Sequence, residues 1–192
     1  MSKKGMHAPR AIAVLRNPRA LCLAGLLAAL SLILGKFLQI PSPVSQVVRI
    51  SFENLPIILS GLVLGPVAGA MTGVVADLVG CALYGYAINP VITLGAAAVG
   101  LVAGLVGMFG SRLPLLLRVV FAVFFSHVVG SVAIKSVGLA AWYLAQMEIG
   151  YAELLLMRSI NYVIVGALEA LLLYLLLRHR GVARQLERMC TK

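Results

Sequence analysis

Acidic side chains are scarce in this chain of 192 residues, which has six Asp and Glu residues against 16 Lys and Arg residues. Cysteine is scarce as well: Cys22, Cys81 and Cys190 lie far apart, with no Cys-x-x-Cys pair and no cluster of Cys and His. This spacing excludes a disulfide framework and argues against a metal site built from cysteine. We therefore expect no metal ion and no other resident cofactor.

Motifs of nucleotide-using and hydrolytic enzymes are absent too. The chain has no Gly-x-x-x-x-Gly-Lys-Ser/Thr phosphate loop, no His-Glu-x-x-His zinc motif and no Gly-x-Ser-x-Gly elbow. Ser126 and His127 are neighbours in the sequence, which is no evidence for a serine hydrolase. The sequence thus predicts a protein that is not an enzyme and that cannot itself use ATP through a phosphate loop.

Apolar residues dominate the composition. The chain is 61% hydrophobic and its mean hydropathy is +1.03, which is typical of a protein embedded in a bilayer. Its net charge of +10 lies mainly in the two tails and around Arg112 and Arg118. Basic residues concentrated in tails and short loops are typical of the cytoplasmic side of membrane proteins. This distribution, without Lys and Arg interleaved with aromatic residues, argues against nucleic-acid binding.

Six apolar segments predict an all-α, polytopic membrane protein with six transmembrane helices. Proline and glycine mark the breaks, for example Gly65-Pro66 between the second and third segments. The predicted spans cover residues 21–38, 54–64, 67–83, 91–109, 117–144 and 154–177. The chain then divides into a basic tail (residues 1–20), a six-helix transmembrane domain (21–178) and a second basic tail (179–192).

The charge distribution also predicts the orientation of the spans. An even number of spans with two basic tails places both termini in the cytoplasm. The loop with Arg112 and Arg118 then lies inside as well. The loops around Arg49, residues 84–90 and residues 148–153 lie outside, together with most of the acidic residues.

Small residues recur every four positions and predict close helix packing. The members of this pattern are Gly61, Gly65, Gly69 and Gly73, followed later in the chain by Gly100 and Gly104. Such stripes let helix backbones approach closely in lipid, and we expect most of them to pack within the chain. Ala24 and Ala28 form a similar pair in the first span, which alone would be weak evidence for a partner protein.

Polar residues gather in the outer halves of the second, third, fifth and sixth spans. Asp77 lies mid-span, where a carboxylate needs a cation, a hydrogen-bonding ligand or a proton. Lys135 and His127 are eight residues apart in the fifth span and share a helix face. The sixth span adds Arg158, Asn161 and Tyr162, and deeper in it Glu169, for which we expect a structural pairing role.

Simple explanations exist for some of these charges. Lys36 lies near an outer helix end and can reach the lipid headgroups. Arg49 can pair with Glu53, and Arg158 with Glu153, as weak interfacial ion pairs. Asp77 and Glu53 nevertheless cannot neutralise Lys36, Arg49, Lys135 and Arg158 all at once. We therefore predict a cavity, open to the outside, for a polar, anionic small molecule with an aromatic part.

Several segments between about residues 20 and 178 are similar to a known family. They are Arg49-Ile-Ser-Phe-Glu-Asn-Leu-Pro-Ile57, Gly65-Pro-Val-Ala-Gly69, Ala76-Asp-Leu-Val-Gly80, Gly85-Tyr-Ala-Ile-Asn-Pro90 with Thr93-Leu94-Gly95, Lys135-Ser-Val-Gly-Leu139 and Arg158-Ser-Ile-Asn161. In them the chain resembles the substrate-binding S components of energy-coupling factor (ECF) vitamin transporters, and most closely the folate-specific branch.

This resemblance implies a six-helix protein of a prokaryotic cell membrane whose vitamin site lies on the outer side, under the first and third external loops. Such S components bind substrate alone but transport it only when docked to a transmembrane coupling subunit driven by two ATPase subunits. Their docking surface resembles the pair Ala24 and Ala28. The resemblance thus implies that this pair is a partner-docking surface.

The chemical groups of folate are complementary to the polar residues described above. Its pterin ring presents donors and acceptors on one edge and a flat face, and its glutamate tail carries carboxylates that Arg and Lys can clamp. The candidate partners of the ring edge are Asp77, Asn54 and Asn89, those of the ring face Phe52, Tyr84 and Tyr86, and the candidate clamps Arg49, Lys135 and Arg158. Glu53, His127, Asn161 and Tyr162 complete the expected site.

Two other functions remain open at this point. Within the family, the substrate could be another vitamin or precursor, such as pantothenate or a queuosine precursor. Outside it, the alternative is a membrane-embedded enzyme, and binding of a ligand without turnover would separate the two classes.

Overall fold

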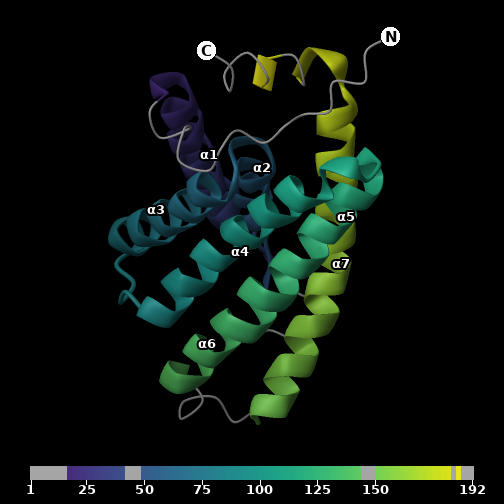
Figure 1. Cartoon of the computed structure of the whole chain (residues 1–192). Helices are drawn as coiled ribbons and strands as arrows, with labels where there is room; N and C mark the ends of the chain where they lie inside the picture. The colour runs from purple at the N-terminus through teal and green to yellow at the C-terminus, as the bar shows by residue number, and fades with distance from the viewer. Residues whose placement is uncertain (1–16, 42–48, 144–149, 183–184, 187–192) are drawn as a thin grey trace.

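The computed structural model describes residues 17–41, 49–143, 150–182 and 185–186 as a bundle of helices (Figure 1). The helices are α1 (Pro18–Phe37), α2 (Asn54–Leu64), α3 (Pro66–Tyr84), α4 (Pro90–Phe109), α5 (Leu115–Ser126), α6 (Lys135–Tyr143) and α7 (Tyr151–Arg178). A π-helical segment, η3 (His127–Ile134), joins α5 to α6, and a 3-10 turn, η2 (Gly110–Arg112), follows α4. The order and approximate bounds of the six predicted helices are confirmed, although only five of the described helical segments are long enough to cross a membrane.

The ends of the helices follow from proline, asparagine and glycine. Asn17 and Asn89 cap α1 and α4 by accepting hydrogen bonds from the backbone two residues ahead, at 3.1 and 3.0 Å, and a proline follows each cap. Gly65, with φ at 98°, separates α2 from α3, and the positive φ explains why glycine stands there. Pro66 then begins α3.

Five of these helical segments are long and apolar enough to cross a membrane. They span Pro18–Phe37, Pro66–Tyr84, Pro90–Arg112, Leu115–Ala141 and Tyr151–Arg178. The remaining apolar helix, α2, has 11 residues, which gives a length of about 16 Å and so about half the hydrocarbon thickness. Its side chains are buried almost all round, because α2 lies inside the bundle rather than facing lipid.

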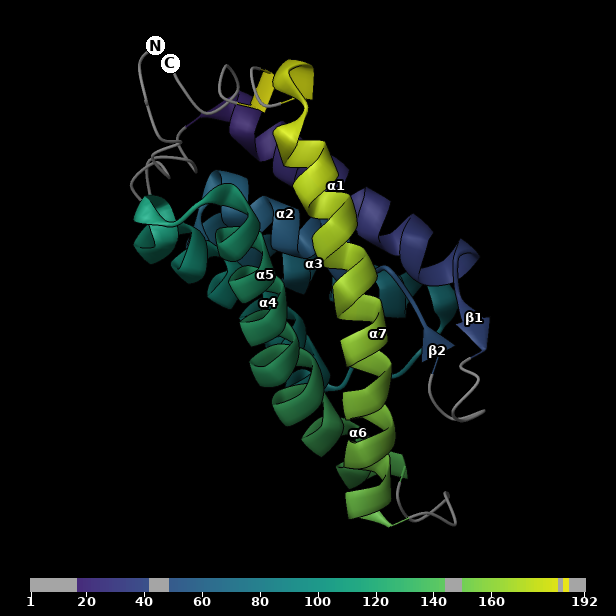
Figure 2. The same cartoon turned by 90° about the vertical axis from the view of Figure 1, so that its right-hand side faces the viewer.

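A short antiparallel strand pair interrupts the otherwise helical fold. Strand β1 (Ile40–Pro41) pairs with β2 (Arg49–Ile50), with Ile40 opposite Ile50. Figure 2 shows the pair beside the middle of α7, on the path from α1 to α2. The prediction of an all-α fold holds apart from this ladder.

The sequence predicted one continuous helix for the fifth span. The structure instead divides this span into α5, η3 and α6. Its middle part is wound as a π-helix, in which the Lys135 N–H donates to the carbonyl of Gly130, five residues earlier. Gly130 lies tightly against α4, since a Cβ on it would come within 2.8 Å of the Gly95 carbonyl oxygen. The π segment places His127, Ser131 and Lys135 at four-residue steps along the helix that carries the polar cluster described below.

The predicted glycine stripes pack α2, α3 and α4 against one another. A Cβ on Gly100 would collide with the backbone of Gly69, and one on Gly61 would collide with Gly100. In lipid the hydrophobic effect does not drive helices together, so the close packing of these backbones stabilises the contacts between the helices instead. The expectation that these glycines serve packing within the chain is confirmed.

Substituting Gly100 with Val is therefore expected to destabilise the bundle by about 1–3 kcal/mol or more, because the added side chain has no room. Thermal unfolding of the purified protein in detergent measures this as a lower melting temperature. Gly25→Val is the matched control, since nothing lies within 4 Å of a Cβ at Gly25 in α1. Equal melting temperatures for both variants would contradict the packing role of Gly100.

Candidate substrate-binding site

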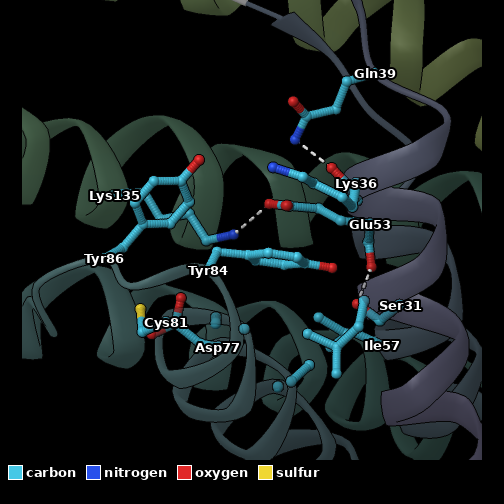
Figure 3. A pocket seen from close by; sticks show the side chains of 16 residues that line it. Ser31, Lys36, Gln39, Glu53, Ile57, Asp77, Cys81, Tyr84, Tyr86 and Lys135 are labelled. Carbon is cyan, nitrogen blue, oxygen red and sulfur yellow. Dashed lines mark hydrogen bonds and ion pairs between the residues drawn. The ribbon is translucent and has the colours of Figure 1, made fainter.

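A cavity lies among α1, α2, α3, α4 and α6, with about 640 Å³ of empty space including its open mouth. Figure 3 shows its charged wall, where Lys36, Glu53 and Lys135 meet above the ring of Tyr84. Of the residues predicted for the site, the cavity brings together Glu53, Asp77, Tyr84, Tyr86 and Lys135.

An ion pair between Lys135 and Glu53 forms one wall. The Lys135 Nζ lies 3.1 Å from Glu53 Oε1 and 3.4 Å from Asn54 Oδ1. Gly95 makes room for the lysine stem, because a Cβ there would lie 2.5 Å from Lys135 Cγ. The nearby ammonium holds the pKa of the Glu53 carboxyl below its usual value, so this carboxyl is ionised at neutral pH.

Glu53 is held in place from a second side. It immediately precedes α2, and its backbone carbonyl accepts a hydrogen bond of 2.6 Å from the Ser31 hydroxyl of α1. The ion pair and this hydrogen bond tie the start of α2 to both α1 and α6. The cavity wall is therefore fixed from two directions rather than by one flexible side chain.

Asp77 lies on the α3 side of the cavity and is partly exposed. Its Oδ2 accepts a hydrogen bond of 2.6 Å from the Thr93 hydroxyl of α4. Among the described residues, no Lys, Arg or His forms an ion pair with it. Its carboxylate thus retains acceptor capacity toward a hydrogen-bond donor in the cavity.

Aromatic rings and a cation stand at the mouth. Lys36, in the last turn of α1, places its Nζ 4.6 Å from the centre of the Tyr84 ring, a cation–π contact. The rings of Tyr84 and Tyr86 are 6.2 Å apart, and Tyr86 is exposed. Gln39 donates to the Gly35 carbonyl at the end of the same helix.

A second polar cluster lies between η3 and α7. His127 Nε2 is 2.6 Å from Glu169 Oε2, and both side chains are buried. Tyr162 stacks on the His127 ring with their centres 4.8 Å apart. Arg158 donates to the Ser131 carbonyl at 2.7 Å. The structural pairing expected for Glu169 is thereby found, with His127 as the partner.

Asn54 connects the two groups. Its amide nitrogen donates to the Ser131 hydroxyl at 3.3 Å, and its amide oxygen accepts from Lys135. Ser131 also lies 3.3 Å from His127 Nδ1. A continuous chain of polar contacts therefore runs from the cavity at Glu53 to Glu169 inside the bundle.

Other predicted site residues lie outside the cavity lining. They are Phe52, Asn54, Asn89, His127, Arg158, Asn161 and Tyr162. Asn89 is buried, caps α4 and donates to the Gly138 carbonyl at 2.9 Å, which is a structural arrangement. The side chain of Arg49 lies outside the part that the structure describes, so its proposed clamp role stays a prediction.

The structure shows an ion pair at the cavity that the sequence did not predict. Glu53 neutralises Lys135, one of the outer cations. The cavity lining has as many carboxylates as cations, Glu53 and Asp77 against Lys36 and Lys135. Arg158 binds a backbone carbonyl rather than Glu153.

Sequence reasoning missed three residues near the site: Lys36 as a lining residue, Thr93 as the partner of Asp77, and Ser131 as the junction beside Asn54. For Lys36 the sequence allowed a contact with lipid headgroups as well as a role toward an anionic ligand. Thr93 follows Asn89 by four residues and therefore lies one turn into a helix that starts at Pro90. This position could have been read from the sequence, whereas the contact of its hydroxyl with Asp77 of α3 required the structure.

A family model described as the ECF-type riboflavin transporter, S component, matches residues 16–179. This match spans most of the chain. The chain belongs to that family. The S component is accordingly a part of a membrane transporter that binds substrate, and it is not an enzyme, as the sequence predicted.

Solved structures show the same fold. One of them, the crystal structure of FolT bound with folic acid, superposes with a TM-score of 0.62 at 23% identity and covers 81% of this chain and 90% of its own. No curated protein sequence matches this chain. The helical membrane fold expected from the resemblance is confirmed by these comparisons.

Proposed function

We propose that this S component binds folate in the cavity between α1, α3 and α4. The observation that carries the proposal is the acceptor capacity of Asp77, which lies in one cavity with two tyrosines and two lysines. The fold shared with FolT, whose structure contains folic acid, supports the same substrate class. A ligand with N–H donors at one end and carboxylates at the other is complementary to both features.

The cavity residues divide naturally between the two ends of folate. A pterin ring presents adjacent N–H groups on one edge, and the Asp77 carboxylate can accept from them while Thr93 holds it in position. Tyr84 and Tyr86 offer ring faces near the mouth. Lys36 stands at the mouth without an ion pair among the described residues, so we assign it to the glutamate tail.

Lys135 has a different part in this assignment. Because Glu53 already neutralises it, it keeps the wall in shape and offers its remaining hydrogen-bonding capacity to the ligand. Arg158, Tyr162 and His127 then support the wall through Asn54 and Ser131 rather than touching the tail. Phe52, Asn161 and Arg49 remain predicted contacts of the ligand.

The family description favours riboflavin as a second candidate. A flavin ring also presents an N–H to a carboxylate and a flat face to tyrosine. Its ribityl chain, however, carries hydroxyl groups instead of carboxylates, so Lys36 would lack an anionic partner. Folate therefore agrees better with the charges of the cavity.

Titration of the purified S component in detergent with folic acid, 5-formyltetrahydrofolate, riboflavin and pantothenate tests the substrate. We expect the folates to bind about ten- to 100-fold more tightly than riboflavin, because the charge-assisted contacts are lost with riboflavin. Calorimetry or the fluorescence of Trp142 gives the dissociation constants. Binding of riboflavin or pantothenate without binding of any folate would overturn the assignment.

Chromatography of the ligand after incubation provides the accompanying control. We expect folate to be recovered unchanged, as for a binding subunit. Conversion of the ligand by the purified chain would instead support the alternative of a membrane-embedded enzyme.

We infer that transport requires an ATP-driven partner, which docks on α1. An apolar groove of about 540 Å³, including its open side, lies between α1 and α3 and is lined by Ala24, Gly25 and Ala28. Figure 1 shows α1 and α3 at one flank of the bundle, away from α5 and α7. A transmembrane coupling subunit with two ATPase subunits is the occupant that the family implies, since a flat stripe permits close helix approach in lipid.

The proposed orientation places the cavity mouth outside a prokaryotic cell membrane and both termini in the cytoplasm. Basic residues stand at the start of α1 (Arg19), in the α4–α5 turn (Arg112) and at the end of α7 (Arg178). The mouth instead involves the last turns of α1 and α3. This separation agrees with a cytoplasmic location of the basic ends.

A further inference from the structure

Within the part of the chain that the structure describes, Arg118 is a buried cation without a partner. Only 7% of it is exposed, and its Nε has no hydrogen-bond acceptor. No hydrogen bond or ion pair joins its side chain to any other residue in the described part of the chain. Burying an unpaired charge costs free energy, so we expect this guanidinium to bind an anion.

The amino-terminal end of α5 adds further donors at the same place. The helix begins after Pro114 without a side-chain cap, and its first helical hydrogen bond runs from Arg118 N to the Pro114 carbonyl at 3.1 Å. The N–H groups of residues 115–117 therefore have no acceptor within the helix, and the helix dipole makes this end positive. An anion at this position would meet backbone donors.

The Arg118 side chain runs toward this helix end. Its Cγ and Cδ lie 3.4 and 3.8 Å from the point where a Cβ on Gly110 would stand, so the stem follows the turn that leads into α5. Side chains in helices point toward the amino terminus. The guanidinium and the free N–H groups thus converge on one site.

The surroundings indicate a lipid rather than a protein partner. Three leucines beside the site are exposed and form an apolar surface against which acyl chains can pack: Leu113, Leu116 and Leu117. Arg112, exposed in the same turn, adds a second positive charge at headgroup level. The α1–α3 flank proposed for docking lies on the other side of the bundle (Figure 1).

We propose that the amino-terminal end of α5 binds the phosphate of an anionic phospholipid, with Arg118 as its charged contact. The phosphate accepts from the guanidinium and from the backbone N–H groups, while the acyl chains lie along the exposed leucines. Such basic pockets at the ends of transmembrane helices are suited to anionic headgroups. This inference does not depend on which vitamin occupies the cavity.

Native mass spectrometry of the full chain in lipid-free detergent tests the proposal with added phosphatidylglycerol. The wild type is expected to hold one lipid at a concentration at least about tenfold lower than Arg118→Met requires, because one charge-assisted contact is lost. Arg112→Met, in the same turn but exposed, should retain most of the affinity. Equal binding by the wild type and Arg118→Met would overturn the proposal.

Two further arms separate the source of the anion and guard against misfolding. Inorganic phosphate should not compete with phosphatidylglycerol at millimolar concentration, and full competition would assign the site to a free anion instead. Without lipid, Arg118→Met should melt at the same temperature as the wild type or higher, since it removes an unpaired buried charge. Failure of this variant to fold would contradict the absence of a partner for Arg118.

Discussion

Asp77→Asn is expected to weaken folate binding by about 1.5–3 kcal/mol, which is a loss of about ten- to 150-fold in affinity. The substitution keeps the shape of the side chain but turns one acceptor into an N–H donor, which would face the N–H groups of the pterin edge. Thr93 can still donate to the remaining oxygen, so the side chain stays in place. Calorimetric titration with folic acid measures the change.

Cys81→Ser is the matched control for this variant. Cys81 lines the same cavity one turn further along α3, and a change from thiol to hydroxyl leaves the shape of the wall intact. Its dissociation constant should stay within about twofold of the wild type. A similar loss in both variants would indicate general damage to the cavity rather than loss of a specific acceptor at Asp77.

Ligand truncation separates the two ends of the cavity. Pteroate lacks the glutamate tail of folate, so Asp77→Asn should weaken pteroate and folate equally. Lys36→Met should weaken folate but change pteroate binding little, because only folate carries the tail carboxylates. If Lys36→Met weakened both ligands equally, Lys36 would not be the contact of the tail.

Ala24→Trp is expected to abolish folate uptake in cells that also produce the ATP-driven partner subunits, while folate affinity of the isolated S component stays unchanged. A bulky ring in the groove between α1 and α3 would keep a partner helix from approaching closely. Uptake of labelled folate and co-purification of the coupling subunit measure the effect. Ala24 suits the test better than Ala28, because Ala28 lines the same groove but is only 3% exposed.

Leu26→Trp provides the control on the same helix. Leu26 is 68% exposed and lies outside the groove lining, so an added ring there would meet lipid. Uptake should remain close to that of the wild type. Loss of ligand binding in Ala24→Trp, with docking intact, would mean that the groove serves packing within the S component.

The spans could be predicted from the sequence because their limits depend on local chemistry. Pro90 after Asn89 favours the start of a helix, and Gly65 before Pro66 favours the end of one, and both boundaries are found there. The glycine stripe was predictable for a similar reason. Gly69 and Gly100 leave no room for any other side chain once α3 and α4 meet.

The pairing of charges could not be predicted in the same way. Lys135 and Glu53 are 82 residues apart, and only the packing of α6 against the start of α2 decides that they meet. The π-helical turn before Lys135 shifts the register of the fifth span, and an α-helical reading of the sequence does not contain that shift. The sequence therefore identified the candidate residues by their chemical type, but the partners of these residues could be found only from the fold.

Alkylation of Cys81 tests most directly whether folate occupies this cavity. In the Cys22→Ser, Cys190→Ser background, Cys81 is the only remaining cysteine, and it is partly exposed in the cavity wall. Maleimide labelling of the detergent-solubilised S component should slow by at least about tenfold at a folic acid concentration of ten times the dissociation constant. Unchanged labelling of Cys81 under conditions where calorimetry shows folate bound would place the ligand elsewhere and contradict the proposed site.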